Sequence, residues 1–160
     1  MRSIFLSITR GLSLSLSIAM SLVFAASASL AAPIERYTDP AMADANLPFS
    51  QAVRVGDMLY LSGQIGNVPG TLDLAPGGME GQARQTMDNI KTVLEANGAS
   101  FAHVTKCLVM LSDMSQWADF NKVYVTYFDQ GQFPARSAFG ANGLALGGAL
   151  EVECEAYLGE

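Results

Sequence analysis

The sequence is short of the residues on which most metal sites and many nucleophilic sites depend. It contains one histidine, His103, and two cysteines, Cys107 and Cys154. These three residues cannot form a zinc site with any recognisable spacing. The sequence therefore argues against a metal and against a histidine-based mechanism, and we expect no cofactor.

Basic residues are scarce as well. Nine Lys and Arg stand against 15 Asp and Glu, which gives a formal net charge of −6. Binding to a phosphate backbone relies on clustered Lys and Arg, and no basic run occurs after residue 31. We therefore expect no nucleic-acid partner.

The chain also lacks a long, uninterrupted apolar run. A shorter one at 12–26, diluted by serines, follows Arg2 and Arg10 and leads into small residues at 25–32. This order of charged, apolar and small residues is typical of a secretory signal peptide. A membrane anchor is the alternative, but a spanning helix needs about 20 apolar residues. We therefore expect an exported protein, periplasmic or secreted, without stable membrane association after cleavage.

Cleavage after Ala28 and cleavage after Ala31 both fit the small-residue pattern. We assign residues 1–31 to the signal peptide and residues 32–160 to one domain, since about 130 residues suffice for one compact domain and not for two. Removal of Arg2 and Arg10 leaves 7 basic residues against 15 acidic ones, a formal net charge of −8.

The two cysteines lie inside apolar, strand-like runs rather than in loops. An oxidising compartment would permit a disulfide between Cys107 and Cys154. Their apolar surroundings favour the other interpretation, in which both are buried thiols that pack as small hydrophobic residues. We expect free thiols.

Turn residues and alternation divide the first half of the domain. Residues 33–48 are polar and predict an irregular lead-in, and 51–55 and 58–62 predict two strands joined by a tight turn at Gly56 and Asp57. Residues 63–78 are rich in Gly and Pro and predict a long surface loop.

Helical spacing begins near Met79 and ends at Gly98, with apolar residues at positions 79, 83, 87, 90 and 94 on one face. Residues 104–111 predict a third strand. A second helix follows, with an aromatic stripe at positions 117, 120, 124 and 128 that is typical of a core, and Gly131 as its end. Strands near 136–140 and 149–158 complete the chain.

The element order β-β-α-β-α-β-β predicts an α+β domain in which two helices cover one face of a mostly antiparallel sheet. The other face would carry apolar side chains with no helix left to cover it. We therefore expect an oligomer that buries this face between subunits.

Arg136 lies where a turn gives way to an apolar strand, directly after Pro134, which restricts the approach of the chain. It is the only arginine after Arg84. A guanidinium on a rigid backbone suits two-point binding of a small carboxylate. A surface arginine at a strand end is the alternative.

Five segments together resemble the RidA/YjgF family, in the same order and with similar gaps: 48–53 (PFSQAV), 61–65 (LSGQI), 119–124 (DFNKVY), 133–137 (FPARS) and 151–153 (EVE). The resemblance covers essentially all of residues 46–158. It implies a chorismate-mutase-like α+β fold and a homotrimer with ligand clefts between adjacent subunits. It also implies hydrolysis of reactive imines and enamines, 2-imino acids among them, to 2-keto acids and ammonia.

The resemblance assigns roles to individual residues. Arg136 matches the arginine that binds the substrate carboxylate, and Glu151 matches the glutamate associated with the hydrolytic water. Further positions match those that line the cleft: Phe49, Ser62, Asn121 and Ala138. Glu153 lies on the same face of its strand as Glu151, where like charges would raise one carboxyl pKa, and we expect Glu151 to be the functional one.

The sequence departs from archetypal members of that family at two cleft positions. Phe49 stands where Tyr is common, and Ala138 stands where Cys is common, and both changes enlarge or dry the cleft. The segment 140–147 also differs from the archetypal loop. An alternative function is a trimeric binder of small carboxylates or a holdase-like protein, which would keep Arg136 and would not need Glu151.

Overall fold

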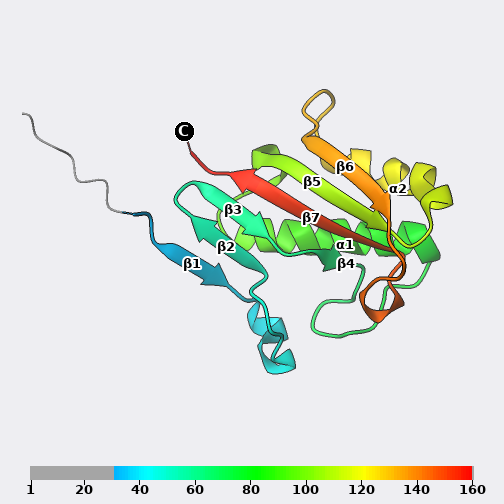
Figure 1. Ribbon diagram of the computed structural model, residues 1–160, viewed down its shortest axis with the longest axis horizontal. Coiled ribbons are helices and arrows are strands. Elements are labelled where there is room, and N and C mark those ends of the chain that lie inside the picture. The colour runs from blue at the N-terminus through cyan, green and yellow to red at the C-terminus, as the bar shows by residue number, and fades with distance from the viewer. Residues whose placement is uncertain (1–30, 160) are drawn as a thin grey trace, which may run out of the picture. The chain divides into compact units, whose positions relative to one another are not determined.

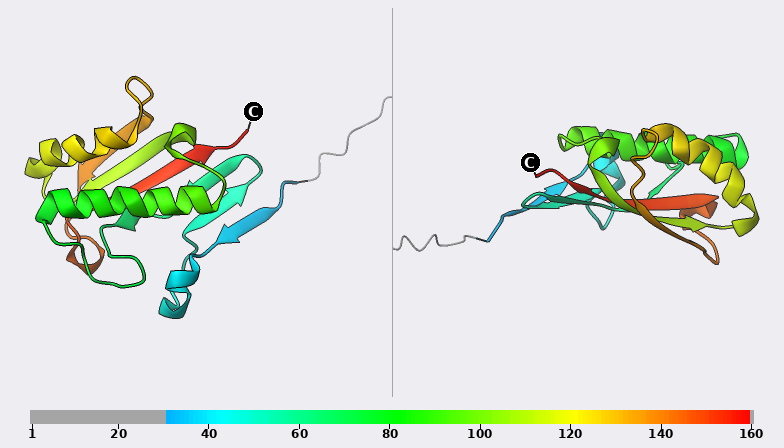
Figure 2. Two further views of the ribbon diagram at one scale, coloured as in Figure 1. Left: turned by 180° about the vertical axis from the view of Figure 1, so that it is seen from behind. Right: turned by 90° about the horizontal axis from the view of Figure 1, so that it is seen from above.

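The computed structural model describes residues 31–159, which form a sheet backed by two helices (Figure 1). The sheet has the strand order β1-β2-β3-β7-β5-β6, and a short strand β4 pairs with β7 beyond the end of β3. Both helices lie on the same face of this sheet (Figure 2). The predicted α+β class with two helices on one face is confirmed.

The N-terminal half of the sheet is built by hairpins. Strands β2 (Ala52–Val55) and β3 (Met58–Leu61) pair antiparallel through a two-residue turn, as the alternation predicts. Gly56 adopts a positive φ of 59° there, which suits glycine. The predicted long loop after β3 contains the short strand β4 (Gln64–Ile65) and a single β-bridge between Asn67 and Leu74.

The prediction of an irregular lead-in at 33–48 is wrong in two places. Strand β1 (Ile34–Tyr37) pairs antiparallel with β2, and a 3₁₀ helix (Pro40–Ala45) follows it. The side chains at 34–36 are exposed, so the strand forms through backbone pairing and leaves no apolar alternation in the sequence.

Helix α1 (Gly78–Ala96) matches its prediction closely and buries the expected apolar stripe against the sheet. Helix α2 (Trp117–Tyr124) begins as expected but ends seven residues before Gly131 and continues as a single 3₁₀ turn (Val125–Tyr127). Phe128 therefore lies in extended backbone, although it still packs against Tyr124, with ring centroids 4.8 Å apart.

The other half of the sheet is formed by the remaining strands, β5 (Val104–Leu111), β6 (Ala135–Gly140) and β7 (Leu150–Tyr157). Strand β7 runs antiparallel to β5, and the edge strand β6 runs parallel to β5. The sheet is thus mostly antiparallel, as predicted.

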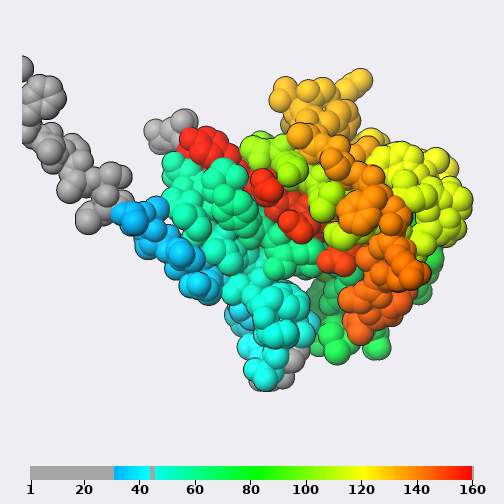
Figure 3. Space-filling model, viewed as in Figure 1, coloured from blue at the N-terminus to red at the C-terminus, as the bar shows by residue number. Residues whose placement is uncertain are grey.

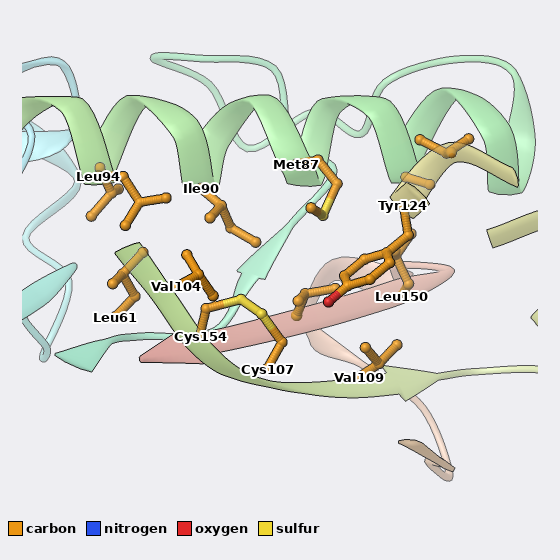
Figure 4. Close-up of a cluster of buried hydrophobic side chains, with 14 of the residues drawn as sticks. Leu61, Met87, Ile90, Leu94, Val104, Cys107, Val109, Tyr124, Leu150 and Cys154 are labelled. Carbon is orange, nitrogen blue, oxygen red and sulfur yellow. A yellow bond between two sulfur atoms is a disulfide. The ribbon is translucent and has the colours of Figure 1, made fainter. Parts of the chain in front are cut away.

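The expectation of two free thiols is wrong. Cys107 and Cys154 form a disulfide between β5 and β7 in the buried core (Figure 4). They lie directly opposite one another in the antiparallel register, where facing Cβ atoms come close enough to be bridged. The two cysteines are therefore both buried and bridged, and their apolar surroundings did not exclude a disulfide.

The second face of the sheet has no helix over it, as expected, but its side chains are mixed. Apolar residues such as Leu108, Met110 and Phe139 share it with Glu153 and Glu155, because they alternate with the buried residues of their strands. Within residues 31–159, no helix is long and apolar enough to cross a membrane.

Candidate active site

Arg136 lies on the helix side of edge strand β6, against one face of α2. Its Nη1 donates a hydrogen bond to Asn121 Oδ1 at 2.9 Å. Its guanidinium carbon lies 4.6 Å from the ring centroid of Trp117 and 4.4 Å from that of Tyr124. Because these residues are spaced by three and four along α2, they share one helix face and together fix the position of the guanidinium.

Aromatic contacts and one amide therefore hold Arg136, and the guanidinium keeps further N–H donors for a ligand. A guanidinium carries five such donors in a planar fork that matches a carboxylate. Arg136 remains exposed at the edge of the sheet. The arrangement is suited to two-point binding of a small acid.

Tyr124 takes part in this arrangement although its side chain is almost fully buried, with 2% of its surface exposed. Its hydroxyl has no hydrogen-bond partner among the described residues. Burial raises the pKa of Tyr124 to about 12, and the nearby charge of Arg136 only partly opposes that rise. The hydroxyl therefore stays neutral near pH 7, and the ring acts through its face.

The aromatic stripe of α2 was predicted to belong to the core, so the role of Trp117 and Tyr124 in holding Arg136 was missed. Phe120, between them, is fully buried and is a core residue as expected. The available signal was their spacing around Asn121 on one helix face.

Glu151 lies on the other face of the sheet from Arg136. Its neighbours Leu150 and Val152 are fully buried on the helix side, so Glu151 points away from the helices. Burial raises the pKa of its carboxyl group, and the charge of Glu153 raises it further. A raised pKa is typical of a carboxyl group suited to exchanging protons near neutral pH.

Gly63, just after the end of β3, is a further residue of the site that the sequence pattern did not indicate. A Cβ built at this position would overlap the Glu151 carboxyl group. The absence of a side chain at position 63 therefore leaves the space that this carboxyl group occupies.

Replacing Gly63 with alanine is expected to push the Glu151 carboxyl group aside while the fold persists, because the obstructing atoms belong to the end of a flexible side chain. A displacement of about 1 Å of a catalytic group can cost about 10²-fold in rate. We expect kcat to fall by that order with an unchanged melting temperature.

The remaining predicted residues fall into the same two groups. Ala138 lies two residues after Arg136 on the same face of β6. Phe49 and Ser62 lie on the Glu151 side of the chain, where Ser62 Oγ donates to Ser50 O at 2.7 Å and ties the segment that carries Phe49 to the end of β3. Phe49 itself is 49% exposed.

The structure thus brings Arg136, Asn121 and Ala138 together, and it brings Glu151 near Ser62 and Phe49. Within one chain the two groups do not meet, because Arg136 and Glu151 point to opposite faces of the sheet. Among residues 31–159, no group of three or more His, Cys, Asp or Glu side chains is placed to hold a metal ion.

Comparison with known proteins identifies the family. The family model described as Endoribonuclease L-PSP matches residues 40–158. The chain belongs to the RidA/YjgF family. It is 41% identical over 112 residues to the 2-iminobutanoate/2-iminopropanoate deaminase of Mus musculus, which covers 70% of this chain and 82% of the mouse protein. The Homo sapiens deaminase is 38% identical, with 70% and 81% coverage.

Solved structures of RidA/YjgF proteins agree with the fold. A putative endoribonuclease L-PSP from Entamoeba histolytica has a TM-score of 0.73 and 37% identity, and the match covers 79% of this chain and all of that one. RidA from the Antarctic bacterium Psychrobacter sp. PAMC 21119 has a TM-score of 0.66 and 40% identity, with 70% and 89% coverage. The fold is the α+β fold of this family.

Proposed function

We propose that this protein hydrolyses reactive 2-imino and enamine acids to 2-keto acids and ammonia. The observation that carries the proposal is the guanidinium of Arg136, held by Asn121, Trp117 and Tyr124 with donors left for a small carboxylate. The names of relatives at about 40% identity point to the same chemistry. The net charge of −6 and the lack of a basic run argue against a ribonuclease.

In this proposal Arg136 binds the carboxylate and Glu151 orients a water molecule or takes its proton. The water oxygen attacks C2 of the protonated imine and forms a tetrahedral carbinolamine. The C–N bond then breaks, the nitrogen leaves as ammonia with the transferred proton, and the C2 oxygen becomes the keto oxygen. Water is the only co-reactant, so no cofactor is required.

We further propose that the active form is a homotrimer whose sites lie between adjacent subunits. Arg136 and Glu151 point to opposite faces of the sheet, so a small imino acid cannot contact both within one chain. A neighbouring copy would supply the missing group and would cover exposed apolar residues such as Phe139. Light scattering should give three times the chain mass, and a stable monomer at micromolar concentration would contradict the trimer.

Export is the third part of the proposal. The buried Cys107–Cys154 disulfide supports it, since disulfides form and persist mainly in oxidising compartments. The predicted signal peptide at 1–31 lies outside the described residues apart from its last residue. N-terminal sequencing of the secreted or periplasmic protein should begin at Ser29 or Ala32, and an intact Met1 in a membrane fraction would contradict export.

The hydrolysis is tested with imines generated in situ by an amino-acid oxidase, followed as keto-acid and ammonia release. Glu151→Gln is expected to bind 2-keto acids as the wild type does, but its turnover should be slower by about 10²-fold or more, the usual effect of losing a general base. Its stability at pH 7 should not fall, because a carboxyl pKa raised by folding means that the ionised form costs stability above the unfolded pKa.

The possible results separate catalysis from binding. A protein that only binds small carboxylates would release no ammonia in either form, and its affinity for keto acids would not depend on Glu151. Unchanged hydrolysis in Glu151→Gln would show that another group holds the water.

The activity should depend on pH through Glu151. Burial and the neighbouring Glu153 raise the Glu151 pKa, so the acid limb of kcat/KM should lie above the pKa of an ordinary glutamate. Glu153→Gln removes the like charge and should move this limb to lower pH. Glu155→Gln, two residues further along the same face, is the matched control with a smaller shift. A limb that moves upward in Glu153→Gln would contradict the assignment.

A further inference from the structure

A cleft of about 300 Å³ lies beside helix α1 and next to the candidate site. The 3₁₀ helix at Pro40–Ala45, the loop after β4 and the turn at Ala145–Gly147 surround it. Figure 3 shows the surface hollowed between the cyan segment that precedes β2 and the green and orange segments. In the mechanism above, Arg136 and Glu151 carry out the binding and the chemistry, and neither of them lines this cleft.

The walls of the cleft are mainly apolar, with side chains of Met42, Leu47, Phe49, Leu72 and Leu146. Three of these, Phe49, Leu72 and Leu146, are about half exposed although they are large and apolar. Apolar side chains grouped around a concave surface mark a binding site for an apolar group.

Polar groups at the cleft are engaged with the protein. The Asn89 amide donates to the backbone oxygens of Ile65 and Asn67, both at 3.0 Å. Gln64, which is 7% exposed, donates to the backbone oxygen of Ser62 at 3.1 Å. These hydrogen bonds hold β4 and the following loop in place. The amide groups of Asn89 and Gln64 therefore stabilise the wall of the cleft and are not free to bind a polar ligand.

Gly63 lies between the cleft and the carboxyl group of Glu151. This glycine lines the cleft, and it also lies against the Glu151 carboxyl group. A substrate bound beside the Glu151 carboxyl group would therefore have the cleft on the other side of a residue without a side chain.

The volume of the cleft favours substrates with a large side chain over substrates with a small one. About 300 Å³ corresponds to about ten water molecules at ~30 Å³ each. The methyl group of 2-iminopropanoate would leave most of that space to water, whereas a branched or thioether side chain of about four heavy atoms would displace several molecules and bury apolar surface.

We propose that this cleft receives the side chain of the substrate, and that the protein prefers 2-imino acids with bulky apolar side chains, such as those formed by oxidation of leucine or methionine. The inference rests on the proposed imine hydrolysis, since it extends the same site. Phe49 at the mouth of the cleft adds to the preference, because its ring has no hydroxyl group to pair with a polar side chain.

The first test compares kcat/KM for imines made by an oxidase from leucine, methionine and alanine. Three further buried carbons should favour the leucine-derived imine over the alanine-derived one by about 10²-fold. Equal kcat/KM values for the two imines would overturn the proposed preference but would not contradict the proposed hydrolysis.

The second test narrows the cleft. Thr92 is an exposed residue of α1 that lines it, whereas the adjacent exposed Lys91 does not. Thr92→Trp should reduce the leucine-to-alanine ratio of kcat/KM at least tenfold, and Lys91→Trp should leave the ratio unchanged. If Thr92→Trp fails to fold, Leu72→Trp, in the loop after β4 that also lines the cleft, provides the same comparison. Equal ratios in a folded cleft variant and in Lys91→Trp would overturn the assignment.

Calorimetry separates this proposal from the proposed function. The wild type should bind 4-methyl-2-oxopentanoate more tightly than pyruvate, and Thr92→Trp should lose that difference. If no imine is hydrolysed, the proposed function fails, and the binding result still decides the cleft: a size preference lost in Thr92→Trp supports it. Equal affinities for the two keto acids, or a cleft occupied by a segment of a second copy, would overturn it.

Discussion

Replacing Arg136 with alanine is expected to remove nearly all imine hydrolysis while the fold remains intact. Truncating one member of a charge pair that is buried on binding costs about 2–5 kcal/mol, or roughly 30- to 5,000-fold in kcat/KM. Arg136→Lys should also lose most of the activity, because an ammonium group cannot reproduce the planar two-point contact or the stacking on Trp117 and Tyr124.

The measurement is kcat/KM for the imine, with calorimetric affinity for the corresponding keto acid alongside it. Arg36→Ala is the charge-matched control, since Arg36 is an exposed arginine of the edge strand β1 at the far side of the sheet. Full activity in Arg136→Ala would leave the deaminase proposal without a substrate-binding group.

The same residue allows a sharp test of a site shared between subunits. Arg136→Ala and Glu151→Gln should each be inactive alone. If one site takes Arg136 from one subunit and Glu151 from its neighbour, trimers reassembled from an equal mixture should regain about a quarter of the wild-type activity. A site within one chain would regain none.

Breaking the Cys107–Cys154 disulfide is expected to have the largest effect on stability. The two cysteines are separated by 47 residues, and closing such a loop in the unfolded chain corresponds to about 4 kcal/mol. Reduction should lower the melting temperature by about 10 °C or more. Because reduction leaves the side chains in place, it isolates the cross-link better than substitution does.

The double variant Cys107→Ala, Cys154→Ala provides the comparison and should melt at or below the temperature of the reduced wild type, since it also loses packing in the core. Melting temperatures with and without reductant are the measurement, together with thiol titration of the exported protein. Two titratable thiols in that protein and a melting temperature insensitive to reductant would contradict the bridge.

The sequence predicted helices and strands most accurately where one face of the element is buried. The stripe of α1 and the whole of β5 follow from their apolar periodicity, because burial of that face requires it. Strand β1 was missed for the complementary reason: its side chains at 34–36 are exposed, and backbone pairing with β2 alone makes it a strand.

Two features of the structure, the disulfide and the face of β6 that carries Arg136, could not be predicted from apolar periodicity. The disulfide depends on register, since Cys107 and Cys154 meet only because β5 and β7 pair as they do. The exposed strand β6 has no apolar alternation that would tell which face carries Arg136. Only the structure shows that Arg136 and Glu151 lie on opposite faces of the sheet, and that Arg136 contacts Trp117 and Tyr124.

Trp117 gives this protein a built-in optical signal. It is the only tryptophan in the chain, and its ring lies 4.6 Å from the guanidinium carbon of Arg136. An acid that binds Arg136 changes the charge and the hydration next to the indole ring. Intrinsic fluorescence can therefore follow occupancy of that half of the site in the unlabelled protein, including rapid-mixing experiments on reactive imines that decay too fast for calorimetry.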